Sequence, residues 1–249
     1  MSPRGNALLG WAAAIALATA FAWLGSWQYG RADEKRQLLA EAGRILQERE
    51  PAPLAAAADI DRAGELEWSA GRGRFIEAGP FLLDNQRHDG QLGVRAYRVF
   101  VPEGIAAGDS ALLVDLGWLP LGPERAMPEV QLPEGTLEVR GLLAPPPSPG
   151  LRLGTGMASL DDGWLLTRVE PDAIAATAGL ALPLAPRVLR LDPALPIGHA
   201  RDLDVLPNTL PPERHVGYAV QWFGLSATVL LVALVLTWRS RRRAAKGTR

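Results

Sequence analysis

The residues best suited to chemistry gather at the entrance of an uncharged apolar segment, in the stretch ERHVGYAVQWFG at residues 213–224. His215, Tyr218, Ala219 and Trp222 are spaced so that they share one face of a helix. A neutral imidazole in an apolar slot is a suitable ligand for a haem iron. The plainer interpretation is an aromatic belt at a membrane surface with a hydrogen-bonded histidine. The residues alone leave both open.

A second cluster closes the other apolar segment, in the stretch WLGSWQYGRADEK at residues 23–35. Its members are separated by one, three or four positions, which predicts one helical stripe: Leu24, Trp27, Gln28, Arg31 and Lys35. Tryptophan and basic residues are common at the edge of a membrane. The alternative is a polar helix face packed against another helix, and the pattern does not decide between the two.

Both clusters require membrane-length helices to position them. Residues 7–27 and 215–238 contain no Asp, Glu, Lys or Arg, and about 20 apolar residues suffice to cross the ~30 Å hydrocarbon core. A cleaved signal peptide is the rival interpretation for the first segment, with a small-x-small site at residues 18–20. The apolar run continues past that site to Trp27, which favours an uncleaved anchor.

The flanks of these segments predict an orientation. Residues 239–249 carry six basic residues and no acidic one, which favours the cytoplasmic side. Two spans then place both ends, 1–6 and 239–249, in the cytoplasm and residues 28–214 in the periplasm. A six-residue stub leaves no room for a mitochondrial transit peptide, so we expect a bacterial inner membrane. The middle has more acidic than basic residues, which argues against a nucleic-acid partner.

The exported part is predicted to be one α+β domain, mostly antiparallel. Residues 28–50 are rich in helix formers and should extend the first span until Pro51. Short alternating segments separated by Gly, Pro, Asn and Asp follow, and this pattern predicts strands: 66–76, 80–86, 93–102, 111–120, 136–144, 164–169 and 187–192. Residues 170–179 are predicted to form a short helix, with Pro171 in its first turn.

Several chemistries are excluded or unsupported. The chain has no cysteine, so it has no disulfide, no thiolate metal site and no CxxCH haem attachment. No GxSxG, P-loop or HExxH motif occurs. The three histidines, His88, His199 and His215, are far apart in the sequence. We therefore expect a protein that is not an enzyme.

Five stretches occur in the order found in one known family: LGSWQYGRADEK, LLDNQR, LLVDLGWLP, VRGLL and RHVGYAVQWFGLS. The sequence resembles the Surfeit-locus-one family of cytochrome oxidase assembly proteins, over nearly the whole chain. It departs from the family pattern at Leu116, where an arginine is usual. It also departs at Gln221 and Ser226, where threonine and alanine are usual.

The resemblance implies a role in building haem-copper oxidase, by helping haem A reach the catalytic subunit. His215 matches the histidine proposed in the family as a haem ligand, and Tyr218 and Trp222 match their positions too. Arg31 and Lys35 are then candidates to pair with the haem propionates, and Trp27 and Trp222 to line the ring. The implied partners are the catalytic subunit of cytochrome c oxidase, haem A synthase and membrane lipid. A scaffold that stabilises a partly built oxidase subunit without binding haem is the alternative.

Overall fold

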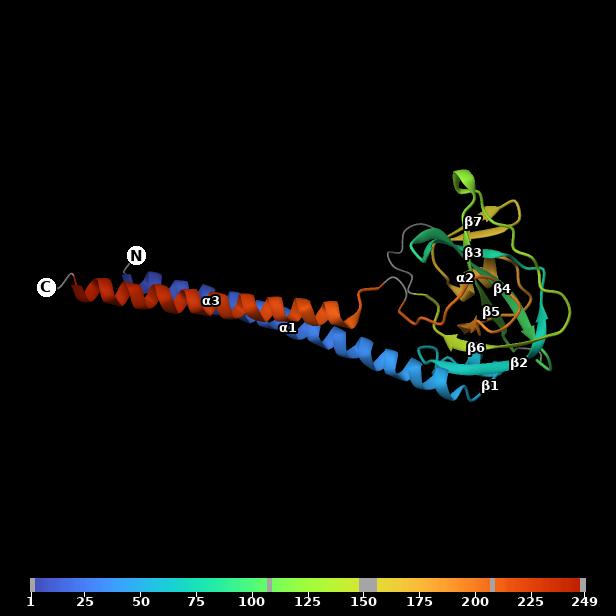
Figure 1. Cartoon of the computed structure of the whole chain (residues 1–249), viewed down its shortest axis with the longest axis horizontal. Coiled ribbons are helices and arrows are strands. Elements are labelled where there is room, and N and C mark those ends of the chain that lie inside the picture. The colour runs from blue at the N-terminus through green and yellow to red at the C-terminus, as the bar shows by residue number, and fades with distance from the viewer. Residues whose placement is uncertain (1–2, 107–108, 148–155, 207–208, 247–249) are drawn as a thin grey trace. The chain divides into compact units, whose positions relative to one another are not determined.

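The computed structural model describes residues 3–106, 109–147, 156–206 and 209–246 (Figure 1). The chain forms two compact units. The first, here called the helix pair, comprises Met1–Ala40 and Leu206–Arg249. The second, here called the β unit, comprises Glu41–Val205. Each is described by itself.

The helix pair is built from two long helices. Helix α1 spans Pro3–Glu48 without a break and α3 spans Pro212–Lys246, and they run side by side in opposite directions (Figure 1). Proline is absent from α1 after its first residue, so nothing interrupts the backbone ladder. Both helices are long and apolar enough to cross a membrane, consistent with an inner-membrane protein.

The β unit contains the strands that the alternating segments predicted. Each of the seven predicted segments overlaps a strand: β2 (Glu67–Phe75), β3 (Phe81–His88), β4 (Gln91–Pro102), β5 (Ala111–Pro120), β6 (Leu137–Ala144), β8 (Gly163–Leu166) and β9 (Leu184–Leu191). The predicted short helix is α2, Pro171–Thr177. Two strands were not predicted, β1 (Ala52–Pro53) and β7 (Met157–Leu160). Both are too short to show a repeating pattern.

The sheet is mixed rather than simply antiparallel, so the predicted fold class needs this correction. Among the described residues the strand order is β1-β2-β6-β9-β5-β4-β3-β8-β7. The parallel pairs are β1–β2, β3–β8 and β5–β9. Parallel neighbours need a crossover instead of a hairpin, and the chain between β5 and β9 supplies one through β6, β7, β8 and α2.

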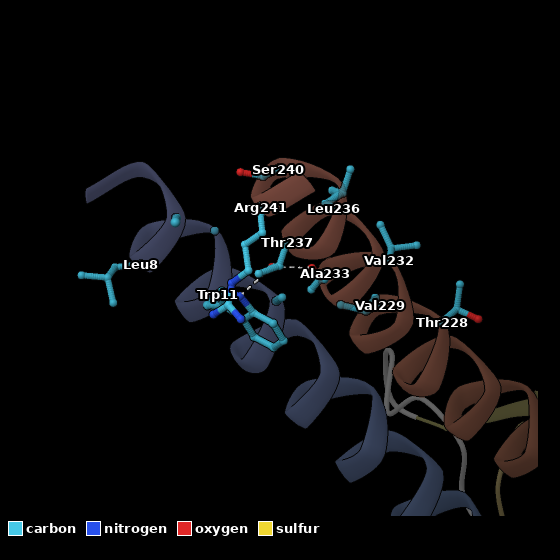
Figure 2. Close-up of a pocket in the computed structure, with 13 residues that line it drawn as sticks. Leu8, Trp11, Thr228, Val229, Val232, Ala233, Leu236, Thr237, Ser240 and Arg241 are labelled. Atoms are coloured by element: carbon cyan, nitrogen blue, oxygen red, sulfur yellow. Dashed lines mark hydrogen bonds between the residues drawn. The ribbon is translucent and has the colours of Figure 1, made fainter. Parts of the chain in front are cut away.

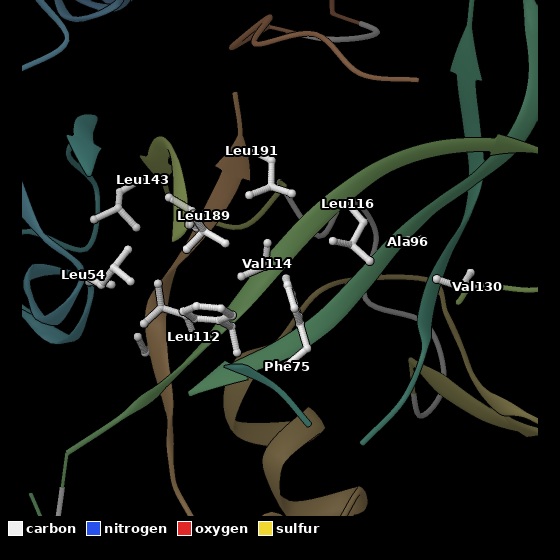
Figure 3. Packing of buried hydrophobic residues seen from close by; sticks show 14 of the residues in the cluster. Leu54, Phe75, Ala96, Leu112, Val114, Leu116, Val130, Leu143, Leu189 and Leu191 are labelled. Carbon is white, nitrogen blue, oxygen red and sulfur yellow. The ribbon is translucent and has the colours of Figure 1, made fainter. Parts of the chain in front are cut away.

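An additional pairing between β2 and β4 closes five strands, β2, β6, β9, β5 and β4, into a ring. The interior is filled by apolar side chains from all five strands, including Phe75, Val114, Val139 and Leu189 (Figure 3). Leu116 belongs to this ring core and is 1 % exposed. The position where the family usually has arginine therefore contributes apolar packing here.

The opposite face of the same strands forms a second core. Successive residues of a strand point to opposite faces, so Leu112 and Val114 enter the ring core while Leu113 faces outward. Helix α2 covers this outer face through Ile174, which packs with Leu113 and Val188. Both faces of β5 are thus buried, as expected for its nearly continuous apolar run.

Gly73 permits the ring to close. It pairs with Pro102, and a Cβ at this position would lie 2.3 Å from the Val101 carbonyl oxygen and 2.6 Å from the Phe100 ring. We expect Gly73→Ala to destabilise the β unit by about 1–3 kcal/mol through overpacking, which lowers Tm by about 2–12 °C. The measurement is thermal unfolding of the purified full chain in detergent.

Gly64→Ala is the matched control, because a Cβ there meets nothing within 4 Å. Equal melting temperatures for the two variants would contradict the assignment of Gly73 as a closure point.

Candidate functional site

The interface between α1 and α3 is lined by small residues. Ala18, Gly25 and Ala32 are buried on α1, seven positions apart, and Ala219 is buried on α3. A seven-residue spacing keeps one face of a helix toward its partner. Within a bilayer, small residues allow two helices to approach closely and gain dispersion contacts. This alignment defines the seam of the helix pair.

Close contacts join α1 and α3 along the seam. A Cβ on Gly25 would lie 2.8 Å from the Phe223 ring, so a larger residue at position 25 would require that ring to move. Ser226 donates its hydroxyl to the Ala18 carbonyl oxygen at 2.8 Å. The Phe21 and Trp222 rings lie 5.5 Å apart, within the range of favourable aromatic pairs.

His215 is the chemically distinctive residue of the seam. It is 8 % exposed, and its Nδ1 lies 2.7 Å from the Gln28 Oε1. An amide oxygen can only accept, so this contact places the proton of the neutral ring on Nδ1 and leaves a lone pair on Nε2. That Nε2 is buried and has no hydrogen-bond partner among the described residues. A buried, unprotonated and unpartnered imidazole nitrogen is a potential metal ligand.

The structure divides the other predicted site residues into two sets. Trp222 and Lys35 are half-buried, and the Lys35 ammonium donates to the Leu210 carbonyl oxygen. Trp27 is 50 % exposed and Tyr218 is 40 % exposed. Arg31 is exposed and pairs with Glu34 at 2.6 Å, one helical turn away. The seam therefore collects His215, Trp222 and Lys35, and Trp27, Arg31 and Tyr218 are solvent-accessible in the isolated chain.

Two contributors to the site had no assigned role in the sequence analysis. Gln28 was placed on a polar stripe, but its bond to His215 joins residues 187 positions apart, and no local spacing reveals such a pair. Gly25 entered the sequence analysis only as part of the motif LGSWQYGRADEK. Its position midway between Ala18 and Ala32, seven residues from each, is the signal that indicates a helix-packing face.

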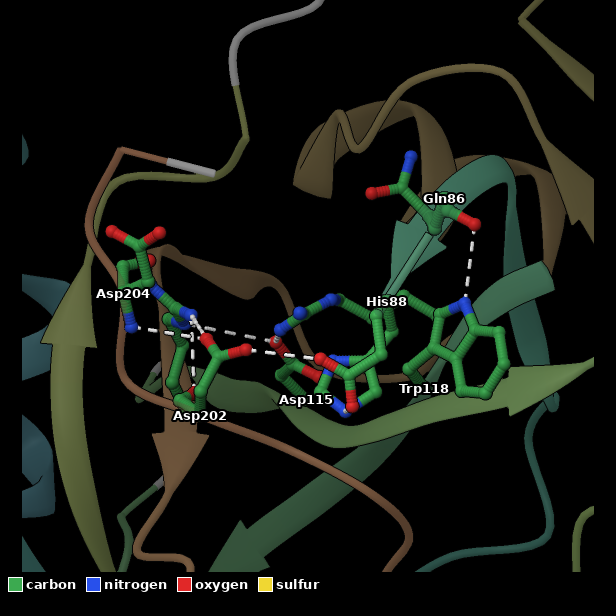
Figure 4. Close-up of polar contacts among 9 residues, drawn as sticks. Gln86, His88, Asp115, Trp118, Asp202 and Asp204 are labelled. Carbon is green, nitrogen blue, oxygen red and sulfur yellow. Dashed lines mark hydrogen bonds and ion pairs between the residues drawn. The ribbon is translucent and has the colours of Figure 1, made fainter. Parts of the chain in front are cut away.

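The β unit has a separate buried charge cluster (Figure 4). The Asp115 carboxylate lies 2.7 Å from Arg95 Nη1 and 3.8 Å from Arg190 Nε, and it accepts the Gly117 amide proton at 2.9 Å. Arg190 also forms an ion pair with Asp202, in which Nη2 lies 3.5 Å from the carboxylate Oδ1. Because these charges are paired across neighbouring strands, the cluster ties β4, β5 and β9 together.

The stretch LLDNQRH, residues 82–88, ends beside this cluster. Trp118 donates its indole proton to the Gln86 carbonyl oxygen at 3.1 Å, and the His88 and Trp118 rings lie 5.4 Å apart. His88 Nδ1 lies 3.6 Å from an Asp202 carboxylate oxygen.

Burial, and secondarily the Asp115 charge, raise the pKa of the Tyr97 phenol, so Tyr97 remains neutral. No group of three or more metal-ligating His, Asp or Glu side chains occurs in the part of the chain that the structure describes.

The chain thus combines a strand ring with two helices that are long and apolar enough to cross a membrane, and a histidine lies in the seam between these helices. A model of the SURF1 family matches residues 15–227. This match spans most of the sequence, so the chain belongs to the SURF1 family, which is linked to cytochrome oxidase assembly. The predicted Surfeit-locus-one membership is thereby confirmed. No curated protein matches the sequence.

The Asp115 cluster gives a stability prediction. Asp115→Asn removes the charge that two buried arginines share, and breaking a buried pair by neutralising one partner costs about 3–5 kcal/mol. We expect that loss in the free energy of unfolding, measured by denaturant titration of the full chain in detergent. Glu48→Gln breaks an exposed helical pair with Arg44 and should change stability little. A similar loss of unfolding free energy in both variants would contradict the stabilising role assigned to the Asp115 cluster.

The seam can be tested by cross-linking, because the chain contains no cysteine. In Ala18→Cys with Ser226→Cys, the two introduced thiols lie on facing positions of the seam. Mild oxidation of membranes should join them and protect both from a maleimide reagent. Ala20→Cys with Ser226→Cys is the control, because Ala20 is exposed. Equal protection of both variants would contradict the described seam.

Proposed function

We propose that this protein is a non-enzymatic assembly factor for cytochrome c oxidase in a bacterial inner membrane, with both termini cytoplasmic and the β unit periplasmic. Family membership supports the assembly role. The length and apolarity of α1 and α3 support two spans. Arg239, Arg241, Arg242 and Arg243 at the end of α3 support a cytoplasmic location for that end.

Within this role, we propose that the helix pair holds haem A transiently and that His215 is its axial ligand. The observation that carries this proposal is the buried Nε2 without a partner, on a ring whose other nitrogen bonds Gln28. When bound, haem A would supply an iron that the imidazole nitrogen of His215 could ligate. Gln28 then acts as the outer partner that fixes the tautomer and orientation of the ligand ring.

The neighbouring residues suit a flat apolar ring with acidic substituents. Trp222 and Phe21 offer aromatic surface in the same seam, with Trp222 two helical turns from His215 along α3. Lys35 and Arg31 offer positive charge for propionates, and Arg31 can leave its exposed pair with Glu34 at little cost. Because His215 is 8 % exposed, loading requires local separation of α1 and α3. A site that opens by helix separation suits a carrier, which must also release the haem.

A second candidate function is a scaffold that holds a partly built catalytic subunit without haem. The observation that favours it is the exposure of several aromatic side chains on the helix pair: Trp23, Trp27, Tyr218 and Phe223. Aromatic residues on an accessible face are common anchors of protein interfaces. The catalytic subunit is the proposed partner in both cases, and haem A synthase is the proposed donor in the first.

Purification after co-expression with the haem A synthesis enzymes tests the haem proposal. The wild-type preparation should show a Soret band, and His215→Ala should lose it because the axial nitrogen is gone. Gln28→Leu should weaken haem binding by about 10–100-fold, the typical effect of losing an outer partner. Haem content is read from the visible spectrum against protein concentration.

His199→Gln is the control, because His199 lies in the β unit and should leave the band unchanged. A preparation without a Soret band, or a band retained in His215→Ala, would remove the ligand assignment. Co-purification of the oxidase subunit in the absence of haem would favour the scaffold. Normal oxidase activity and haem content after gene deletion would overturn the assembly role itself.

A further inference from the structure

The helix pair contains a groove at the end opposite to His215 along α3. It has a volume of about 820 Å³ and lies between the first turns of α1 and the last turns of α3 (Figure 2). Gly10 and Ala14 leave space on α1, and Val232 and Leu236 supply apolar walls on α3. The groove is separate from the histidine site and is not explained by it.

The dimensions of the groove match one leaflet of a bilayer. Its lining on α3 extends from Thr228 to Arg241, which corresponds to about 20 Å at 1.5 Å per residue. One leaflet contributes roughly 15 Å of the hydrocarbon core. An extended acyl chain can therefore lie along the α3 wall over the depth of a leaflet, and α1 lines about 10 Å of that length between Ala7 and Ala14.

Polar groups inside the groove are already satisfied, which makes it suitable for an apolar chain. The Trp11 indole donates to the Thr237 hydroxyl at 3.0 Å, and that hydroxyl donates to the Ala233 carbonyl oxygen at 2.7 Å. Thr228 donates to the Gly224 carbonyl oxygen at 2.8 Å. The Trp11 indole and the Thr228 and Thr237 hydroxyls therefore need no polar ligand.

The end of the groove is positively charged. Arg241 lines it beside Ser240, and within the described residues Arg241 has no hydrogen-bond or ion-pair partner. Its neighbour Arg242 lies over the Trp238 ring at 3.6 Å. Residues 7–32 and 214–243 contain no acidic side chain, so no protein anion from the helix pair's spanning parts is available to Arg241. A ligand with an anionic group at this end would neutralise it.

We propose that this groove is a binding site for one anionic phospholipid, with an acyl chain between α1 and α3 and the phosphate group paired with Arg241. Basic pockets between helices on the cytoplasmic side are suited to anionic headgroups. The site rests on the membrane placement argued above. Lipid in the groove fills the space that the small residues of α1 leave, and so stabilises the helix pair at this end.

The test uses the full chain, reconstituted into bilayer discs of equimolar phosphatidylglycerol and phosphatidylcholine. Native mass spectrometry after gentle release counts the lipid retained per chain. We expect about fivefold preference for phosphatidylglycerol, the effect of one arginine near a charged headgroup. Arg241→Gln should abolish this preference. Arg239→Gln is the matched control, since Arg239 does not line the groove, and should keep it.

Gly10→Leu tests the acyl-chain part, because a Cβ at Gly10 meets nothing within 4 Å and a larger side chain occupies the groove. Retention of both lipids should fall in this variant. The cysteine cross-link between positions 18 and 226 verifies that the seam persists in each variant. Equal retention of the two lipids by the wild type, no effect of Arg241→Gln, or a porphyrin recovered from the groove would each overturn the proposal. Release of the chain from membranes by alkaline carbonate would instead contradict the membrane placement.

Discussion

The hydrogen bond between Gln28 and His215 joins two helices that are far apart in the sequence, and the candidate site depends on it. A glutamine oxygen cannot donate a proton, so the bond sets which imidazole nitrogen is protonated. The other nitrogen is then a lone pair held inside the seam. Gly25 lies three residues before Gln28 and leaves room for the Phe223 ring of α3. A side chain on α1 thus controls the chemistry available on α3.

The β unit is stabilised by two apolar cores and a buried charge cluster. Its strand ring buries apolar side chains inside while a second core forms under α2. The charge of Asp115 is buried on the outer face, where Arg95 and Arg190 compensate it. A buried charge is tolerated only when it is paired and hydrogen-bonded, and the paired set spans three neighbouring strands. This cluster is therefore a structural link between strands.

The helix pair carries two sites of opposite character under the proposals above. One end presents an imidazole nitrogen with positive side chains nearby, suited to a cofactor with acidic groups. The other presents an apolar groove that ends at Arg241, suited to a lipid. Both use the same property of the seam, in which small residues leave room between two helices. A carrier anchored by lipid at one end can open at the other while its helices remain associated.

Much of the fold was predictable from the sequence because its signals are local. Apolar length predicts the two long helices, and alternation predicts seven strands, since both depend on neighbouring residues. Motif order was sufficient to indicate the family. The strand ring, the parallel neighbours of the mixed sheet and the pairing of Asp115 with two arginines were not predictable, because each joins distant segments. For the site, spacing indicated that His215, Tyr218 and Trp222 share a face, although Tyr218 is 40 % exposed in the structure. Only the tertiary structure decided which side chains enter the seam, because that depends on where Gly25 and Ala219 allow α1 and α3 to touch.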